Sequence, residues 1–240
     1  MKDILMIGAS SDAGTEILKH LCETGKDLRV FAHYNRSDER ITALSGSFPE
    51  TEFITCKADL TDTINTQKMA EKLLAEGCVP SVFIYLPAPP FSYMRIKEFE
   101  AGALKDAISI GAESFLVLCR SFLPLMKKNG GNVIVMLTAY VADELPPKYM
   151  TDYVVGKYAL LGAMKTAAAE YGTDKLRVNA IAPEMMDTHF LDNIDPRIKE
   201  MSAAGTTAGR LLTPSDLLPV VDEMLSPVFK DNGRIIRVSL

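Results

Sequence analysis

Short, continuous apolar runs alternate along this chain with stretches whose apolar residues recur every three or four positions. The first run, residues 4–7, leads through a turn of small residues into a stretch where Ile17, Leu18 and Leu21 recur at helical spacing. A continuous apolar run is typical of a strand buried on both faces, whereas the wider spacing indicates a helix with one buried face. The pattern predicts seven strands, over residues 4–7, 28–33, 52–56, 82–86, 133–137, 177–181 and 235–238.

Helical stretches separate most of these strands. We expect helices over residues 37–45, 62–75 and 150–171, and two in succession between residues 97 and 128. Strands that alternate with helices predict an α/β fold of three layers, with a doubly wound, seven-stranded parallel sheet covered on both faces. The chain has no linker, repeat or low-complexity tract, so we expect residues 1–240 to form one domain.

Composition and charge narrow the functional classes. Apolar residues make up 48% of the chain and charged residues 24%, as in ordinary globular proteins. The net charge of −5 argues against a nucleic-acid partner. No apolar run approaches the roughly 20 residues of a membrane helix, and the N-terminus does not resemble a secretory signal. We therefore expect a cytoplasmic protein with free thiols, and the scattered histidines predict no metal site.

Residues 8–14 form the small-residue turn between the first strand and the first helix. Backbone N–H groups at such a helix start are suited to a pyrophosphate, so the turn predicts a nucleotide site. Ligands of parallel sheets bind beyond the carboxyl ends of the strands. Besides this turn, the groups expected there are Asp59, the break at residues 87–90, Thr138 and the loop 183–188.

Tyr153 and Lys157 are four positions apart and share one face of the helix predicted at 150–171. An ammonium group near a phenol favours the phenolate and lowers the pKa of the phenol. Many surface helices carry such a pair without any chemistry. Here the helix begins shortly after Thr138 leaves its strand, so a hydroxyl, a phenol and an ammonium should converge near a bound dinucleotide.

The order and spacing of these motifs resemble the short-chain dehydrogenase/reductase family almost end to end. The resemblance rests on the turn at residues 8–14, the segment 58–62, Thr138, the Tyr153–Lys157 pair and the segment 177–183. It implies a Rossmann fold and an NAD(P)-dependent oxidoreductase that interconverts a carbonyl and a secondary alcohol, with a general likeness to 3-oxoacyl-carrier-protein reductases. The residues expected to contact the cofactor are Gly8, Ser10, Ser11, Gly14, Asn35, Arg36, Asp59, Leu60, Ala88, Tyr153, Lys157, Pro183 and Thr188.

The resemblance also implies roles for three catalytic residues and an assembly. Tyr153 would exchange a proton with the substrate oxygen, Lys157 would lower the pKa of Tyr153 and bind the nicotinamide ribose, and Thr138 would orient the substrate. Relatives form dimers or tetramers through two long helices, here residues 101–128 and 150–171. The apolar positions that could form this homo-oligomeric seam, or could equally face the sheet, are Phe115, Leu118, Phe122, Leu161, Met164 and Ala168.

The end of the second strand bears on cofactor choice. A cofactor with a free ribose 2′-hydroxyl calls for an acid about 20 residues past the glycine turn. This chain has Tyr34-Asn35-Arg36-Ser37 there, and Arg36 could pair with a 2′-phosphate. We therefore expect NADP(H) rather than NAD(H), unless Arg36 is simply a solvated loop residue.

Several residues depart from the family pattern. Asp12 replaces the middle glycine of the turn, where a carboxylate would either repel phosphate or cap the helix; we expect it to cap, with its side chain turned away. Gly111 replaces an asparagine that holds a relay water, Glu184 replaces the glycine after Pro183, and Ala88 alone remains of the Asn-Asn-Ala-Gly segment. These departures support a second hypothesis, a nucleotide-binding sensor or scaffold of the same fold with little or no turnover.

The substrate pocket is expected beneath residues 188–209. A medium-sized, partly apolar carbonyl or alcohol is the predicted substrate. Apolar contacts are expected from Met185, Met186, Phe190, Leu191 and Met201. The sequence leaves open whether the cleft is also lined by Tyr93, Arg95, Tyr140 and Tyr149. Residues 203–209 are either a lid or plain surface.

Overall fold

The computed structural model describes residues 1–89, 95–141 and 145–240, in which seven parallel strands form one sheet. The strand order is β3-β2-β1-β4-β5-β6-β7, so the chain crosses from β3 over to the other side of β1 before β4. The strands are β1 (Lys2–Ile7), β2 (Leu28–Tyr34), β3 (Glu52–Lys57), β4 (Pro80–Tyr85), β5 (Gly131–Met136), β6 (Leu176–Pro183) and β7 (Ile235–Val238). The predicted α/β fold class is confirmed, and each predicted strand end lies within two residues of the observed one.

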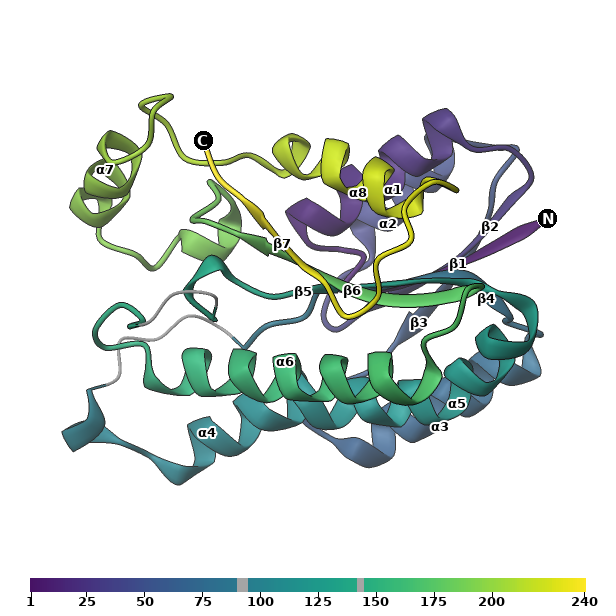
Figure 1. Ribbon diagram of the computed structural model, residues 1–240, viewed down its shortest axis with the longest axis horizontal. Coiled ribbons are helices and arrows are strands. Elements are labelled where there is room, and N and C mark those ends of the chain that lie inside the picture. Colours follow the sequence, from purple (N-terminus) through teal and green to yellow (C-terminus); the bar gives the residue numbers. More distant parts are fainter. Residues whose placement is uncertain (90–94, 142–144) are drawn as a thin grey trace.

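Helices cover both faces of the sheet and make three layers (Figure 1). One face carries α1 (Asp12–Thr24), α2 (Glu39–Ser47) and α8 (Leu218–Leu225). The opposite face carries α3 (Thr63–Ala75), α4 (Ala101–Ile108), α5 (Ser114–Asn129) and α6 (Thr151–Tyr171). Each face has its own cluster of buried apolar side chains, because alternate residues of the strands point to opposite sides.

The two helices predicted between residues 97 and 128 are joined by a π-helical turn, Ser109–Glu113. The buried Tyr85 hydroxyl and the Ser114 hydroxyl both donate to the carbonyl of Ile110 within this turn. The run Ala101–Asn129 is long and apolar enough to cross a membrane, but half of its most apolar window is buried inside the protein. Such burial is usual for the core helix of a globular fold.

Five of the six positions named for an oligomer seam face the sheet, which was the other possibility. Phe115, Leu118, Phe122 and Met164 have no exposed surface and Ala168 has 4%, so these side chains belong to the core. Leu161 is only partly buried and packs against the same cluster.

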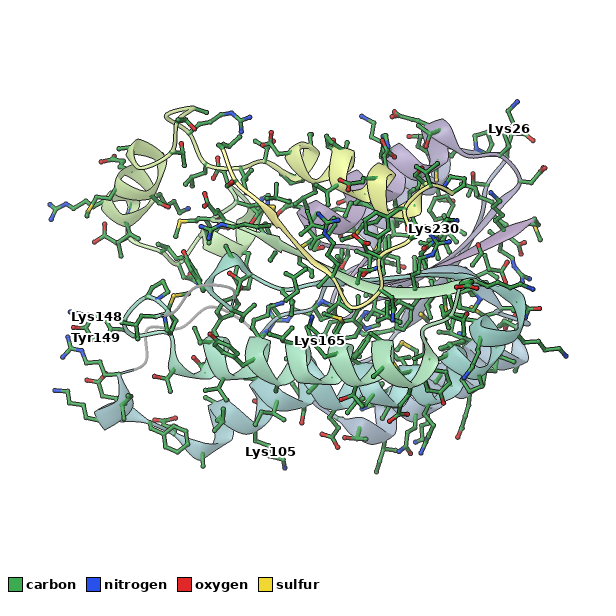
Figure 2. The ribbon with its side chains drawn as sticks, viewed as in Figure 1. Lys26, Lys105, Lys148, Tyr149, Lys165 and Lys230 are labelled. Atoms are coloured by element: carbon green, nitrogen blue, oxygen red, sulfur yellow. The ribbon has the colours of Figure 1, made fainter. Side chains whose placement is uncertain are left out.

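The C-terminal third holds elements that the apolar pattern did not predict. These are the 3-10 helices η4 (His189–Leu191) and η5 (Pro214–Leu217) and the helices α7 (Pro196–Ala204) and α8. α7 projects at the left of Figure 1, on the side of the sheet where β1 ends. On α6, Lys165 donates to the carbonyl of Gly233 at 2.5 Å, which ties this helix to the loop before β7 (Figure 2).

All four cysteines are free and buried. Cys22 lies in the cluster beneath α1, whereas Cys56, Cys78 and Cys119 lie in the cluster on the opposite face. Burial raises the pKa of every one of these thiols, that of Cys56 to about 12. Among the described residues, no group of three or more His, Cys, Asp or Glu side chains is arranged to hold a metal ion.

Candidate active site and dinucleotide cleft

The turn after β1 depends on glycine at two positions. Gly8 has a φ of +86°, which side-chain-bearing residues rarely adopt. A Cβ on Gly14 would lie 2.4 Å from the Gly8 carbonyl oxygen, so only glycine lets α1 start this close to the strand. Ser11 caps α1, because its hydroxyl accepts from the Gly14 N–H at 3.0 Å and donates to the Gly8 carbonyl at 2.7 Å.

The prediction that Asp12 caps this helix is therefore wrong. Asp12 is the first residue of α1, and its carboxylate turns across the cleft to Arg40 of α2 and His189 of η4. No local pattern in the chain indicates these contacts, because the partners lie 28 and 177 residues away.

His33 is a further residue of the cleft that the sequence did not single out. The Gly8 N–H lies 3.1 Å from His33 Nδ1, and His33 Nε2 lies 3.1 Å from the Ala58 carbonyl. Since Nδ1 must accept, Nε2 carries the proton. Burial lowers the pKa of His33 to about 4, so the neutral ring joins the glycine turn to the end of β3 at physiological pH.

A cavity of about 210 Å³ lies beside this histidine at the carboxyl ends of β1 to β4. It is lined by Gly8, Ser10, Ser11, His33, Asn35, Asp59, Leu60, Pro87, Ala88 and Ile110. The predicted cofactor residues Asn35, Asp59, Leu60 and Ala88 are thus brought together. The Thr61 N–H and hydroxyl, and to a smaller extent the charge of Arg36, hold the pKa of Asp59 below its ordinary value. Arg36 itself is exposed and lies outside the lining of this cavity.

A larger cavity of about 590 Å³ lies on the other side of the glycine turn. Nine predicted site residues line this cavity: Gly8, Ser10, Ser11, Ala88, Thr138, Tyr153, Lys157, Pro183 and Thr188. Two predicted site residues line neither cavity, namely Arg36 and Gly14, which packs beneath the turn. Because Gly8, Ser10, Ser11, Pro87 and Ala88 line both cavities, the two spaces lie next to each other along the turn.

Thr138, Tyr153 and Lys157 converge in this larger cavity. Thr138 follows β5, and the other two come from the first turns of α6. Tyr153 and Thr138 share a side-chain hydrogen bond. The Lys157 ammonium donates to the Met136 carbonyl at 2.8 Å and to the Pro87 carbonyl at 3.4 Å, and it lies 5.9 Å from the centre of the Tyr153 ring. All three side chains are buried.

Burial controls the protonation of the pair. It raises the pKa of Tyr153 to about 12, although the bond from Thr138 works in the opposite direction. Burial also lowers the pKa of Lys157 to about 7. The expected lowering of the Tyr153 pKa by Lys157 is thus not seen in this structure. Desolvation has the largest effect on the phenol and the charge of Tyr140 adds to it, whereas the Lys157 ammonium is directed at two backbone carbonyls.

The other departures from the family pattern have structural explanations. A Cβ on Gly111 would lie 2.8 Å from the Gly156 carbonyl oxygen, so the close approach of the π turn to α6 leaves no room for the family's asparagine. The Glu184 carboxylate accepts from Arg237 of β7 at 2.7 Å, and the Glu184 N–H donates to the Val238 carbonyl at 3.0 Å. Glu184 therefore fastens the loop after β6 to the edge strand.

The far wall of the larger cavity is mainly apolar. It is formed by Tyr140, Met150, Met185, Met186, Phe190, Leu191 and Ile194. Phe190 lies with its ring centre 5.9 Å from that of Tyr153. Met201 was expected here, but it is 75% exposed on α7 and lies outside the lining.

Two further residues expected in the lining pair with each other outside it. The Arg95 guanidinium lies 5.1 Å from the centre of the Tyr149 ring, in the loop at the left end of Figure 2. Tyr93 and Pro90 lie outside the described residues.

The residues present fit a dinucleotide in shape and in polar groups. The glycine turn is shaped by Gly8 and Gly14, and polar side chains line the smaller cavity next to it. The Asp12 carboxylate, which lines the larger cavity, carries a charge that would repel a phosphate placed beside it.

Comparison with known proteins decides the family. The sequence profile of the family described as Enoyl-(Acyl carrier protein) reductase, a branch of the short-chain dehydrogenases/reductases, matches residues 8–234. The chain belongs to the short-chain dehydrogenase/reductase family. The relatives that match are named dehydrogenases and reductases, and this family comprises oxidoreductases that act on CH–OH groups.

Individual relatives in this family are distant. The chain is 25% identical over 225 residues to the uncharacterized oxidoreductase YmfI of Bacillus subtilis, covering 94% of this chain and 91% of that one. It is 26% identical over 249 residues to 7α-hydroxysteroid dehydrogenase of Escherichia coli, covering 99% and 92%.

Solved structures of short-chain dehydrogenases/reductases share the fold. A putative gluconate 5-dehydrogenase from Beutenbergia cavernae with bound NADP superposes with a TM-score of 0.87 at 20% identity, covering 99% of this chain and 95% of that one. A 7α-hydroxysteroid dehydrogenase in complex with NADH and 7-oxo glycochenodeoxycholic acid gives a TM-score of 0.86 at 21% identity, covering 99% and 92%.

Proposed function

We propose that this protein is an NADP(H)-dependent oxidoreductase that interconverts a carbonyl and a secondary alcohol, with Tyr153 as general acid and base. The observation that supports this most strongly is the convergence of Thr138, Tyr153 and Lys157 in one buried cavity that the glycine turn also lines. A nicotinamide cofactor bound there would supply or accept the hydride.

The protonation of Tyr153 suits the reductive direction. A phenol with a pKa of about 12 remains protonated at neutral pH, so Tyr153 can donate its proton to the oxygen of a carbonyl as negative charge develops there. Thr138, already bonded to Tyr153, would orient the same oxygen. Lys157 would favour the phenolate that remains, provided that a bound ligand draws its ammonium away from the two carbonyls.

The residues at the end of β2 bear on the choice between NADP(H) and NAD(H). The segment there is Tyr34-Asn35-Arg36-Ser37, without the acid that pairs with a free 2′-hydroxyl. Asn35 lines the smaller cavity, and Arg36 lies close enough to Asp59 to lower its pKa. A 2′-phosphate at this place would meet Arg36, which supports NADP(H) over NAD(H). Titration of both cofactors tests this, and tighter NADH binding would remove the preference.

The apolar wall of the larger cavity supports a medium-sized, partly apolar substrate. Met150, Met185, Met186, Phe190 and Leu191 offer flexible and aromatic contacts beside Tyr153. A 3-oxoacyl thioester fits this description. A 25% identical relative in Chlamydia muridarum is named 3-oxoacyl-[acyl-carrier-protein] reductase, and the E. coli relative is named for a hydroxysteroid.

Two observations favour a second candidate, a nucleotide-binding sensor or scaffold with little turnover. Asp12 presents a carboxylate within the cleft, and Gly111 supplies no side chain to hold a relay water.

Turnover distinguishes the two candidates. NADPH oxidation should be followed by absorbance with a panel of ketones and 3-oxoacyl thioesters, for the wild type and for Tyr153→Phe. We expect turnover of at least one substrate, reduced about a thousandfold or more in Tyr153→Phe at saturating NADPH, because the proton donor is lost. Tight NADPH binding without any Tyr153-dependent turnover would instead favour the sensor or scaffold.

The proposal includes a homodimer or homotetramer and the cytoplasmic location expected from the sequence. Apolar side chains that remain exposed on the helical layer of α4 to α6 support an assembly. They are Ile108, Leu116, Val155 and Tyr158.

A further inference from the structure

Three donors from distant parts of the chain converge on the Asp12 carboxylate. Arg40 Nη1 lies 2.5 Å from Asp12 Oδ1, and the His189 N–H donates to Oδ2 at 2.9 Å. The His189 ring adds Nδ1, which lies 2.9 Å from Oδ1 and 3.2 Å from Arg40 Nη2. The ring therefore either donates to the carboxylate or accepts from the guanidinium, depending on its tautomer. The carboxylate joins α1, α2 and η4 across the mouth of the cleft.

These donors are of the kind that binds phosphate. A guanidinium, a backbone N–H and an imidazole all bind phosphate oxygens as they bind carboxylate oxygens. Asp12, Arg40 and His189 all line the larger cavity, next to Ser11 of the glycine turn and Thr188. A dinucleotide that follows the turn would bring its phosphates to this place.

The environment keeps Asp12 charged. Partial burial raises the pKa of its carboxyl group, but the His189 N–H, Arg40 and the His189 ring together more than offset this and leave the pKa below its ordinary value. A second anion brought beside this carboxylate would be repelled unless the carboxylate moves away and leaves its donors to that anion.

We propose that Arg40 and His189 form a binding site for a phosphate oxyanion of the dinucleotide, and that the Asp12 carboxylate occupies this site as an internal substitute for that phosphate. The inference rests on the proposed function, because it assigns the site to the same cofactor. When the cofactor binds, its phosphate replaces the Asp12 carboxylate as the hydrogen-bond acceptor of Arg40 and His189. Asp12 thereby weakens cofactor affinity, and the family's glycine at this position would not.

The exchange also reaches the catalytic residues. Phe190 follows His189 in η4 and lies against the ring of Tyr153. A shift of His189 from the carboxylate to the phosphate would carry Phe190 with it, and so would move the apolar wall beside the proton donor.

The test compares cofactor affinity in variants that change one charge. Asp12→Asn keeps the shape of the side chain and removes its charge. It should lower the Kd for NADPH, measured by nucleotide fluorescence, about tenfold, because the donors are released and the repulsion is lost. Arg40→Ala added to Asp12→Asn should abolish this gain. Glu39→Gln is the matched control, since Glu39 is exposed next to Arg40, lies outside the cavity lining and carries the same charge. An unchanged Kd in Asp12→Asn, or an equal gain in Glu39→Gln, would overturn the inference.

Comparison of the two cofactors identifies the phosphate. An equal gain for NADH and NADPH assigns the site to the diphosphate bridge, and a gain confined to NADPH assigns it to the 2′-phosphate. Both outcomes support the exchange.

Inorganic pyrophosphate separates this inference from the proposed function. Calorimetric titration with pyrophosphate needs no nicotinamide and no turnover. Tighter binding of pyrophosphate to Asp12→Asn than to the wild type supports the oxyanion site even if no substrate is turned over. If NADPH is turned over but neither pyrophosphate nor NADPH binds Asp12→Asn more tightly, the function stands and the inference fails.

Discussion

At the scale of single residues, Lys157 shows how burial controls a charged group. Its side chain is 2% exposed and its ammonium bonds to two backbone carbonyls, which supply partners but no counter-charge. Since the charged form is poorly solvated, the pKa falls to about 7. The lysine thus changes charge within the physiological range, which a surface lysine does not.

This shift predicts a pH dependence of stability. Between pH 7 and about 10 the unfolded chain holds the Lys157 proton and the folded chain does not, so the free energy of unfolding rises with pH. The contribution is about 1.4 kcal/mol per pH unit within that window, and Lys157→Met should remove it. Tyr153 acts in the opposite sense only above its ordinary pKa of about 10. Denaturant unfolding at pH 7.5, 8.5 and 9.5 measures the slope.

Lys105 provides the control for this measurement. It is exposed on α4, on the outer side of the helical layer (Figure 2). Lys105→Met should leave the slope unchanged. Equal slopes in the wild type and Lys157→Met would show that Lys157 keeps its proton when folded.

Some of the site residues could be predicted from the sequence, whereas their contacts and protonation could not. Thr138, Tyr153 and Lys157 could be named because their spacing places them at one edge of a parallel sheet. The contacts of Asp12 could not, since they join residues far apart in the chain. The direction of the Tyr153 pKa shift could not be predicted from the sequence either, because it depends on how completely the surrounding side chains exclude water.

At the scale of elements, the contact between the π turn and α6 is set by backbone atoms. Gly111 and Gly156 face each other, and a Cβ on Gly156 would lie 2.9 Å from the Ala107 carbonyl oxygen. The two helices can approach this closely only because neither carries a side chain there. The absence of the family's asparagine is therefore a consequence of how these helices pack.

Two glycines of α6 should respond oppositely to substitution. Gly156→Ala should destabilise the fold by about 2 kcal/mol, because the added methyl forces α4 and α6 apart. At Gly162 no described atom beyond its two neighbours and the adjoining backbone of α6 lies within 4 Å of an added Cβ. Gly162→Ala should therefore stabilise the fold by up to about 1 kcal/mol through helix propensity. Urea unfolding of both variants measures the difference. If both variants are more stable than the wild type, helix propensity alone would govern these positions of α6. If both are less stable, packing alone would govern them.

The apolar pattern predicted best the elements that are buried along most of their length. β1, β4 and β5 were found within two residues because each contains a continuous apolar run bounded by glycine, proline or polar residues. The other four strands contain single polar residues but remain short and mostly apolar between polar or turn segments. The helices η5 and α8 were missed because Pro214 and Pro219 interrupt their pattern, although proline is well tolerated in a first helical turn. The choice between an oligomer seam and the sheet stayed open for another reason: periodicity identifies a buried face but does not say what buries it.

At the scale of the whole molecule, the helical layer of α4 to α6 presents apolar side chains to its surroundings. Leu116 is 45% exposed, Val155 41% and Tyr158 40%. Isolated exposed apolar residues are normal, but a set on one layer is typical of an interface.

We predict that the protein sediments as a dimer or tetramer and that Leu116→Lys or Val155→Lys shifts it toward the monomer. A charge placed in an apolar interface loses its hydration without gaining a partner. Val228→Lys is the control, because Val228 is 83% exposed after α8, away from this layer. A monomeric wild type in analytical ultracentrifugation would contradict the prediction.

The placement of the cysteines has a practical consequence for following how this molecule opens. Cys22 lies on one side of the sheet and Cys56, Cys78 and Cys119 on the other, and each is kept as the unreactive thiol by burial. An alkylating reagent can therefore modify them only when the layer above them lifts away. Mass spectrometry of the labelled peptides would then record separately when each side of the sheet is uncovered, without any engineered probe.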